Sequence, residues 1–266
     1  GQVDDARHTM MIARTAATYG AHCATSARVV DFLREGDRVV GAVVRDLESG
    51  HEHHIRAKQT INAAGVWTDE IQDMLGGRGQ FKVRASKGIH LIVPRDRIHA
   101  SSGIISRTEK SVLFIIPWED HWIIGTTDTD WNLDLAHPAA SQSDIDYLLD
   151  HANALLEQPL TRDDVVGVYA GLRPLLAGES DATSKLSREH AVVSPVAGMV
   201  IIAGGKYTTY RVMAQDAVDA AVRSMGSDVP DSVTEDVLIV GADGYQAVWN
   251  QREAVAARSG LHVARI

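Results

Sequence analysis

The sequence predicts an α/β protein built in two layers, with an antiparallel sheet inserted into a parallel α/β layer. Residues 199–203 form an apolar run rich in β-branched side chains, too short for a helix and typical of a buried parallel strand. Gly204 and Gly205 follow it, and a helical pattern begins after Arg211. Between residues 83 and 127 the pattern changes to successive short strands, which indicates an antiparallel layer. We therefore expect a ligand at the junction of the two layers.

The composition is that of an ordinary globular protein. Its 266 residues suffice for one or two domains, and 45% of them are hydrophobic. The net charge of -9 argues against nucleic acid as a partner, although cationic side chains gather between residues 78 and 97. Cys23 is the one cysteine, so no intramolecular disulfide can form. No apolar segment is long enough to span a bilayer, and the start at Gly1 rather than Met indicates a piece of a longer protein.

The elements expected in the first third of the chain follow from capping residues, glycines and alternation. Asp4 or Asp5 can cap a helix that runs to about Tyr19 and ends at Gly20. A short strand is expected at 22–26, an antiparallel meander over about 28–56, another strand at 58–62 and a helix at about 67–75.

The remaining elements follow from the same signals. Strands are expected at 89–93, 102–105, 112–116, 122–124, 165–169 and 191–193, an amphipathic helix at 142–156, and mostly helix after Gly226. This order places the strands of the second layer between the parts of the first, which is why we expect an insertion.

Two glycine-containing turns are candidates for contact with a ligand. After the strand at 199–203, Gly204 and Gly205 let a ligand approach the backbone, and the helix start that follows offers N–H groups. Lys206 adds positive charge. The segment 63–65, Ala-Ala-Gly, repeats this arrangement after the strand at 58–62. Close packing of a helix on a strand is the alternative explanation for each segment taken alone, and it is the more common one for a segment such as 63–65.

Histidine and arginine side chains are candidates for acid–base and anion-binding roles. His90 lies on a strand and is either a base near neutral pH or a structural histidine. Arg173 precedes Pro174, so its backbone is extended and its guanidinium direction is fixed. Such a group suits a phosphate or carboxylate, or else a structural ion pair. Arg188, taken alone, is interpreted as a solvated side chain.

No metal site is expected. Asp128, Asp130 and Asn132 resemble the start of a calcium loop, but Leu133 and Ala139 stand where that loop needs Gly and Glu. The histidines of the meander, His51, His53 and His54, have no acidic or cysteine partner at metal-ligand spacing.

Several motifs together resemble one family. In order along the chain they are Asn62-Ala63-Ala64-Gly65-Val66-Trp67, Lys87-Gly88-Ile89-His90-Leu91-Ile92-Val93-Pro94-Arg95, Pro117-Trp118-Glu119, Ile124-Gly125-Thr126-Thr127-Asp128, Tyr169-Ala170-Gly171-Leu172-Arg173-Pro174-Leu175 and Gly204-Gly205-Lys206-Tyr207-Thr208-Thr209-Tyr210-Arg211. Their order and spacing resemble the aerobic, FAD-dependent glycerol-3-phosphate dehydrogenases. The resemblance extends from Gln2 to about Val240.

The resemblance implies a fold and a domain division. The fold would be an FAD/NAD(P)-binding, glutathione-reductase-like α/β domain with an inserted antiparallel-sheet substrate domain. The family's Gly-x-Gly-x-x-Gly turn, which holds the FAD pyrophosphate, is not in this sequence, so we expect an N-terminally truncated domain. The expected parts are 1–80 and 191–225 for the FAD-binding domain, 81–190 for the substrate domain, and 226–266 for the start of a helical C-terminal domain.

The resemblance also implies a reaction and its partners. The family oxidises sn-glycerol 3-phosphate to dihydroxyacetone phosphate, with hydride transfer to FAD and electrons passed to membrane quinone. A homodimer is expected, in the cytoplasm and peripheral at the inner face of the cell membrane.

Site residues are carried over by motif. The catalytic residues implied are His90, Arg173 and Lys206, and the substrate-binding residues are Thr127, Arg173, Arg188 and Lys206. The cofactor-binding residues implied are Arg28, Ala64, Gly65, Trp67, Gly204, Gly205, Lys206 and Thr208. Two alternatives stay open: an FAD-dependent amine or 2-hydroxy-acid oxidase of the same fold, and an isolated non-catalytic fragment without bound cofactor.

Overall fold

The computed structural model separates into two compact units. The residues described are 3–76, 81–109, 112–177, 189–226 and 228–263. The first unit comprises Gly1–Val29, Val44–His53 and Pro230–Ile266, and the second comprises Val30–Val43 and His54–Val229. The four-part domain division expected from the sequence stays a prediction. Apart from Arg28, the candidate site residues belong to the second unit.

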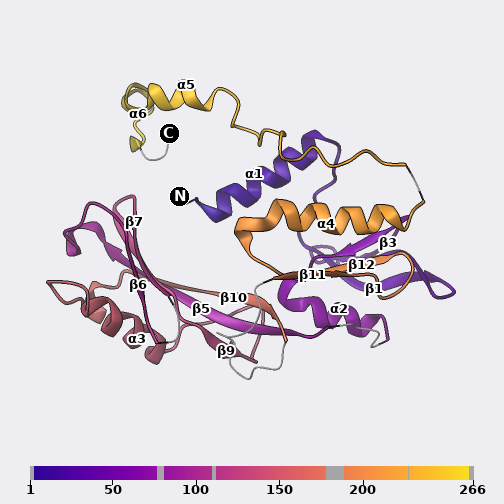
Figure 1. Ribbon diagram of the computed structural model, residues 1–266, viewed down its shortest axis with the longest axis horizontal. Coiled ribbons are helices and arrows are strands. Elements are labelled where there is room, and N and C mark those ends of the chain that lie inside the picture. The colour runs from indigo at the N-terminus through magenta and orange to yellow at the C-terminus, as the bar shows by residue number, and fades with distance from the viewer. Residues whose placement is uncertain (1–2, 77–80, 110–111, 178–188, 227, 264–266) are drawn as a thin grey trace. The chain divides into compact units, whose positions relative to one another are not determined.

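A small mixed sheet lies in the second unit. Its order is β11 (His190–Val193), β12 (Met199–Gly204) and β4 (Thr60–Asn62), with β12 parallel to β4 and antiparallel to β11. Every residue of β12 is buried, so the prediction of a buried parallel strand at 199–203 is confirmed. The helix α4 (Tyr210–Arg223) runs along this sheet and contacts each of its strands (Figure 1).

An antiparallel sheet forms the second layer of this unit. Its strands are β5 (Val83–Pro94), β6 (Ile104–Arg107), β7 (Val112–Trp118), β8 (His121–Gly125), β9 (Thr129–Trp131) and β10 (Gly167–Leu176). The order is β10-β5-β8-β7-β6, and β9 also pairs with β5. The long strand β5 therefore lies between β10 and β8 and pairs with both.

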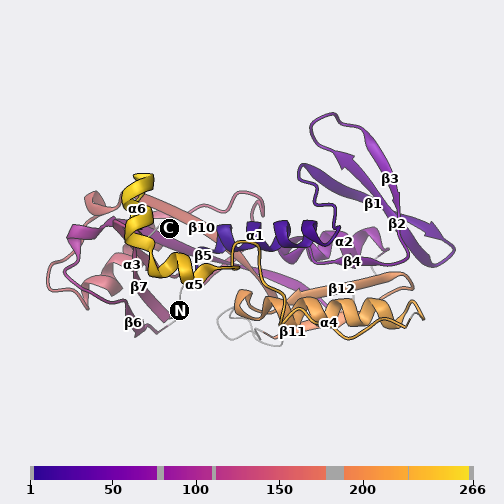
Figure 2. The ribbon, with the colours of Figure 1, turned by 90° about the horizontal axis from the view of Figure 1, so that it is seen from above.

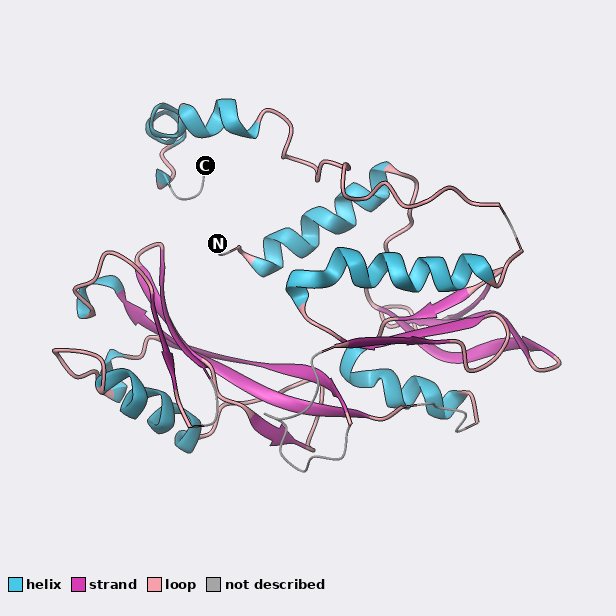
Figure 3. Cartoon of the chain, in the orientation of Figure 1, coloured by secondary structure: helices cyan, strands magenta, loops and turns pink. Residues whose placement is uncertain are grey.

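The helix α3 (Gln142–Asn153) covers one face of the antiparallel sheet (Figure 3). Ser141 and Asp144 form a capping box that starts the helix. Leu148 on α3 and the alternating residues Ile89, Leu91 and Val93 on β5 have no exposed surface. The burial of these apolar side chains is the main stabilising contribution to the layer.

The remaining elements are helices, strands and 3-10 turns, here in chain order. They are α1 (Asp5–Thr18), β1 (Ala27–Glu35), β2 (Arg38–Asp46), β3 (Glu52–Arg56), the 3-10 turn η1 (Gly65–Trp67), α2 (Thr68–Met74), η2 (Arg95–Arg97), η3 (Arg162–Asp164), η5 (Tyr207–Thr209), α5 (Tyr245–Asn250) and α6 (Arg252–Ser259). The strands β1, β2 and β3 lie side by side in a separate sheet (Figure 2).

Some expected elements differ from the structure. Residues 22–26 are not a strand: they are exposed, and Ser26 has a left-handed φ of 53° that ends extended pairing. The strand expected at 165–169 begins at Gly167 and continues to Leu176, so Arg173 lies within it rather than after it. The prediction of mostly helix after Gly226 is only partly right, because α5 and α6 follow a largely irregular segment. No described helix is long and apolar enough to cross a membrane.

Candidate functional site

The parallel pairing brings the two glycine-containing turns to one edge of the sheet. Asn62 on β4 is opposite Ile201 on β12, so both strands end on the same side. The side-chain oxygen of Asn62 accepts a hydrogen bond from the Ala64 backbone N–H at 2.9 Å and shapes the first turn. The segment 63–65 and Gly204 therefore share this edge, as the sequence predicts for a ligand site.

Gly204 and Gly205 both adopt a left-handed backbone. Their φ angles are 77° and 85°, which L side chains rarely adopt. A Cβ at Gly204 would lie 2.4 Å from the Glu189 carbonyl oxygen, and one at Gly205 would lie 2.4 Å from the Met213 sulfur. The glycines are therefore required by the chain's own packing, in addition to any ligand.

A pocket opens over this edge. It has a volume of about 500 Å³. Its lining residues are Ile61, Ala63, Pro174, Ile202, Gly204, Gly205, Lys206, Tyr207, Tyr210, Met213, Ala214, Ala217 and Val218. The lining is mostly apolar, and Lys206 is its charged member. Such a pocket suits a flat apolar group with a polar edge.

The start of α4 borders the same pocket. Tyr210, its first residue, lines the pocket, and the helix has no side-chain cap at its start. The Thr209 hydroxyl instead donates to the Lys206 carbonyl at 3.0 Å. The Tyr210 backbone N–H donates to the Tyr207 carbonyl, so the turn η5 leads directly into α4. Thr208, in the turn η5, is exposed.

Arg173 is oriented by the loop that follows β8. Its Nη2 donates to the Thr126 hydroxyl at 2.9 Å, and its Nη1 donates to the Thr127 carbonyl at 3.2 Å. Pro174, the next residue, lines the pocket described above. Arg173 and Pro174 are consecutive in β10, so their side chains point to opposite faces of the strand.

Gly88 makes room for that guanidinium. It lies opposite Gly171 in the pairing of β5 with β10. A Cβ at Gly88 would lie 2.4 Å from Arg173 Nη2 and 2.5 Å from the Thr126 hydroxyl. Any larger side chain there would displace the contact between Arg173 and Thr126.

His90 lies two residues after Gly88 on β5. Its ring stacks on that of Tyr169, with centroids 4.9 Å apart and planes inclined by 14°. Its strand neighbour Gly125 is packed so closely that a Cβ would lie 2.2 Å from the ring. Burial, and next the positive charge of Arg173, lower the pKa of His90 to about 4. The imidazole is therefore neutral at physiological pH.

Thr127 is buried and is used by the chain itself. Its side chain is 3% exposed, and its hydroxyl accepts a hydrogen bond from the Ile89 backbone N–H at 3.1 Å. Its backbone carbonyl accepts the hydrogen bond from Arg173 Nη1. Thr127 therefore holds the loop against β5, and its expected contact with substrate stays a prediction.

Lys87 forms a buried ion pair behind this cluster. Its ammonium lies 2.6 Å from the Asp144 carboxylate and 3.1 Å from the Ala139 carbonyl, and it packs over the Trp131 ring. Burial raises the pKa of Asp144, but hydrogen bonds from Lys87 and Ser141 outweigh it and hold that pKa below its usual value. The pair ties β5 to the start of α3.

The other expected site residues lie in different places. Ala64 and Gly65 are partly buried beside the pocket edge, and Trp67 is 41% exposed in η1. Arg28 is exposed on β1, in the first compact unit. Arg188 lies outside the described residues. Among the residues that the structure describes, no cluster of His, Cys, Asp and Glu could hold a metal ion.

Sequence reasoning missed Thr126, Gly125, Tyr169 and Gly88 as members of the cluster. Each lies within a motif that the sequence singled out, but its role depends on strand pairing. The register of β5 with β8 and β10 is what brings them together. A pairing prediction for the strands at 83–94, 121–125 and 167–176 would have found them.

Comparison with known sequences links the chain to one family. The sequence profile of the family described as FAD dependent oxidoreductase matches residues 1–217. The chain is 64% identical over 264 residues to glycerol-3-phosphate dehydrogenase 2 of Mycobacterium tuberculosis, covering 99% of this chain and 45% of that protein. It is 36% identical over 256 residues to the human mitochondrial glycerol-3-phosphate dehydrogenase, covering 92% of this chain and 35% of that protein. The chain thus spans about half or less of the length of the curated relatives it matches.

Comparison with solved structures agrees. The glycerol-3-phosphate dehydrogenase of Bacillus halodurans, solved in complex with FAD, superposes with a TM-score of 0.82 at 32% identity, covering 99% of this chain and 52% of that one. Glycine oxidase of Bacillus cereus superposes with a TM-score of 0.56 at 16% identity, covering 84% of this chain and 56% of that one, which is a similarity of fold alone.

Proposed function

The chain belongs to the FAD-dependent oxidoreductase family, and on that premise we propose that it forms part of an enzyme that oxidises sn-glycerol 3-phosphate to dihydroxyacetone phosphate. The observation that carries this proposal is the 64% identity to mycobacterial glycerol-3-phosphate dehydrogenases over 99% of the chain. The neighbouring side chains of Arg173 and His90 support it, together with Lys206 in the pocket wall, because they offer cations for a phosphate and a neutral base for a hydroxyl.

The pocket over Gly204 and Gly205 fits the flavin end of FAD. A side chain at either glycine would collide with other atoms of the chain. The backbone at these two positions therefore carries no side chain that would keep a ligand away. The apolar lining suits the face of a ring system, and Lys206 offers a charged group to its polar edge. The residues that would hold this end are Ala64, Gly65, Trp67, Gly204, Gly205, Lys206 and Thr208. Arg28 is proposed for the adenine end, for which this sequence offers no phosphate-cradling glycine motif.

Bound FAD would supply the two-electron acceptor for the hydride that leaves C2 of the substrate. The chain's own residues would bind and orient that substrate. Arg173, with its guanidinium held by Thr126 and Thr127, would hold the phosphate together with Lys206 and Arg188. Each charge-assisted hydrogen bond contributes roughly 1.5–3 kcal/mol, so the phosphate would supply most of the affinity.

His90 would accept the proton of the C2 hydroxyl. Its neutral imidazole has a lone pair available at physiological pH, because burial and Arg173 hold its pKa near 4. A base with such a low pKa is weak on its own. A phosphate dianion beside Arg173 would offset that positive charge and raise the pKa of His90 toward the working pH. Substrate binding would thus make His90 a stronger base.

The electron acceptor and the location belong to the same proposal. Electrons would pass to membrane quinone from a homodimer that sits in the cytoplasm, peripheral to the inner face of the cell membrane. This part of the proposal draws on the resemblance to glycerol-3-phosphate dehydrogenases, and the net charge of -9 gives no support for nucleic acid as a partner.

Turnover of candidate substrates by the full-length protein tests the proposal. We expect reduction of an artificial electron acceptor with sn-glycerol 3-phosphate and none with glycine, sarcosine or a 2-hydroxy acid. Turnover with the amine or the hydroxy acid instead would favour the alternative oxidase. Absence of turnover with every substrate would favour a non-catalytic protein.

Arg173→Ala tests the phosphate clamp directly. We expect the KM for glycerol 3-phosphate to rise at least about tenfold, since one charge-assisted hydrogen bond exceeds 1.4 kcal/mol. The control is Arg162→Ala, which removes an arginine of an exposed ion pair with Asp146. An unchanged KM in the Arg173 variant would reject the clamp.

A further inference from the structure

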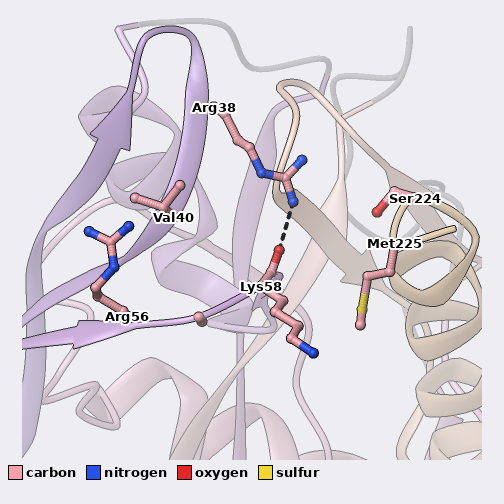
Figure 4. Close-up of a pocket in the computed structure, with 7 residues that line it drawn as sticks. Arg38, Val40, Arg56, Lys58, Ser224 and Met225 are labelled. Atoms are coloured by element: carbon pink, nitrogen blue, oxygen red, sulfur yellow. Dashed lines mark hydrogen bonds between the residues drawn. The ribbon is translucent and has the colours of Figure 1, made fainter. Parts of the chain in front are cut away.

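A second pocket lies within the same compact unit. Its volume is about 670 Å³, and its lining residues are Arg38, Val40, Arg56, Ala57, Lys58, Ser224 and Met225 (Figure 4). Arg38 begins β2, Arg56 ends β3, and Lys58 lies in the link to β4. Figure 4 shows Arg38 reaching toward the backbone of Lys58, with Ser224 and Met225 on the other side. Nothing in the proposed reaction uses these residues.

The cationic side of this pocket is fixed by hydrogen bonds. Arg38 Nη2 donates to the Lys58 carbonyl at 2.8 Å, and the Ala57 backbone N–H donates to the Val40 carbonyl at 2.9 Å. These contacts hold β2 against the segment that carries Arg56 and Lys58. The positive charges are therefore part of a defined concave surface rather than of a loose tail.

The charges in the pocket are poorly balanced. Its lining contains Arg38, Arg56 and Lys58 and no acidic side chain. Glu35 pairs with Arg56 at the surface, with both side chains more than half exposed, and such pairs contribute little. The end of α4 adds a partial negative charge of about half a unit, which offsets only part of the excess. A basic pocket on a chain of net charge -9 is a local feature that calls for an anion.

We propose that this pocket binds the phosphate group of a phosphate-bearing ligand. Three cations, Arg38 on β2 and Arg56 and Lys58 at the end of β3 and just after it, line it, which is more than a carboxylate needs and suits a tetrahedral dianion with several oxygens. The volume exceeds that of a phosphate alone, so the group would be part of a larger molecule. Ser224, whose hydroxyl donates to the Ala221 carbonyl at 2.7 Å, is a polar group on the opposite wall.

This pocket is separate from the candidate active site. Lys58 precedes β4, whereas Ala63 follows it, so the two pockets lie toward opposite ends of that strand. Tyr210 begins α4 and lines the active-site pocket, whereas Ser224 follows the helix. A helix of 14 residues is about 20 Å long, which sets the scale of the separation. The proposal therefore does not depend on the proposed function.

The phosphate has two sources, a soluble phosphorylated molecule or an anionic lipid headgroup. The probes are inorganic pyrophosphate, titrated by calorimetry, and vesicles of phosphatidylglycerol with phosphatidylcholine, measured by co-sedimentation. Both use the full-length protein at low ionic strength, where such contacts are least screened. An Arg173→Ala background weakens the contribution of the candidate active site to the pyrophosphate signal.

The pocket variant combines Arg56→Gln with Lys58→Gln, neither of which removes the Arg38 contact to the Lys58 backbone. The control combines Arg107→Gln with Arg162→Gln, which also removes two exposed cations, one of them from an exposed ion pair. Arg38→Gln is a second test of the pocket, with thermal unfolding measured to check that it folds.

Expected is a loss of affinity of at least about tenfold in the pocket variants and not in the control. If the loss concerns pyrophosphate, the source is soluble, and if it concerns only the anionic vesicles, the source is a headgroup. Equal binding by the parent, the pocket variants and the control with both probes would overturn the proposal, as would the failure of the parent to bind either probe.

Discussion

His90 is held neutral by its surroundings, and this couples its protonation to the stability of the fold. Burial and the charge of Arg173 lower its pKa from 6.5 to about 4. Between these pH values the unfolded chain binds more protons than the folded one, so stability rises with pH across this window. The contribution is fully present above pH 6.5 and is lost as the pH falls toward 4.

We expect His90→Asn to flatten this dependence. From pH 6.5 to pH 4 the parent should lose up to about 3 kcal/mol more of its unfolding free energy than the variant, because the variant has no imidazole to protonate. Urea unfolding at a series of pH values measures this. His53→Asn, which changes an exposed histidine of β3, is the control. Parallel curves for the parent and His90→Asn would contradict the assigned pKa.

The environment of Arg173 could be predicted only in part from the sequence. Because Pro174 follows Arg173, the sequence predicts an extended backbone at Arg173, and the structure has a strand there. The two acceptors of the guanidinium, in Thr126 and Thr127, are more than forty residues earlier in the chain. Only the order of strands β10, β5 and β8 makes them neighbours, and the local sequence does not encode that order.

At the scale of elements, the pairing of β5 with β10 places two glycines opposite each other with unequal surroundings. A Cβ at Gly88 would collide with the guanidinium of Arg173 and the Thr126 hydroxyl, whereas a Cβ at Gly171 meets nothing within 4 Å. One strand pair therefore offers a test position and a matched control.

Gly88→Ala should displace Arg173 and raise the KM for glycerol 3-phosphate by about tenfold, the effect of one charge-assisted hydrogen bond. Gly171→Ala should leave the KM within about twofold, because its side chain enters open space. Steady-state kinetics of the full-length variants decides. Equal KM values for the two would show that Gly88 has no role in placing the guanidinium.

The ion pair between Lys87 and Asp144 joins β5 to α3 in a buried setting. Lys87→Met should cost about 3–5 kcal/mol of unfolding free energy, since it leaves the Asp144 carboxylate buried without its cation. Arg162→Met breaks an exposed pair with Asp146 on the same helix and should cost less than about 1 kcal/mol. Denaturant unfolding compares the two, and similar costs would refute the difference that burial makes.

Element prediction succeeded where one chain segment carries its own signal. The helices α1 and α3 and the strand β12 follow from caps and apolar runs, and the structure has them at nearly the expected bounds. The strand β9 was missed because it has three residues and exists through its pairing with β5. Residues 22–26 alternate like a strand but have no strand pairing among the described residues.

At the scale of the whole chain, the sequence has a candidate flavin pocket but no phosphate-cradling glycine turn, since it contains no Gly-x-Gly-x-x-Gly. Both the glycines of the pocket and the absence of this motif could be recognised in the sequence, because each is a local pattern. The sequence could not predict that Gly204 and Gly205 are also required by Glu189 and Met213, which pack against them.

We expect the 266-residue chain to retain less FAD than the full-length protein. Without backbone N–H groups around the pyrophosphate, the ADP half of the cofactor gains little binding energy. The ratio of flavin absorbance to protein absorbance after purification measures this. Equal ratios in the two proteins would mean that the pocket over Gly204 and Gly205 holds the cofactor without the glycine turn.

The parallel pairing also constrains the order of assembly. Thr60 pairs with Met199, and the whole antiparallel sheet, from Val83 to Leu176, lies between them in the chain. During synthesis β4 leaves the ribosome long before its partner β12 exists. Closing so long a loop costs less entropy once the intervening sheet has become compact. The layer with Arg173 and His90 is therefore expected to form first, and the cofactor edge is completed only when β12 arrives.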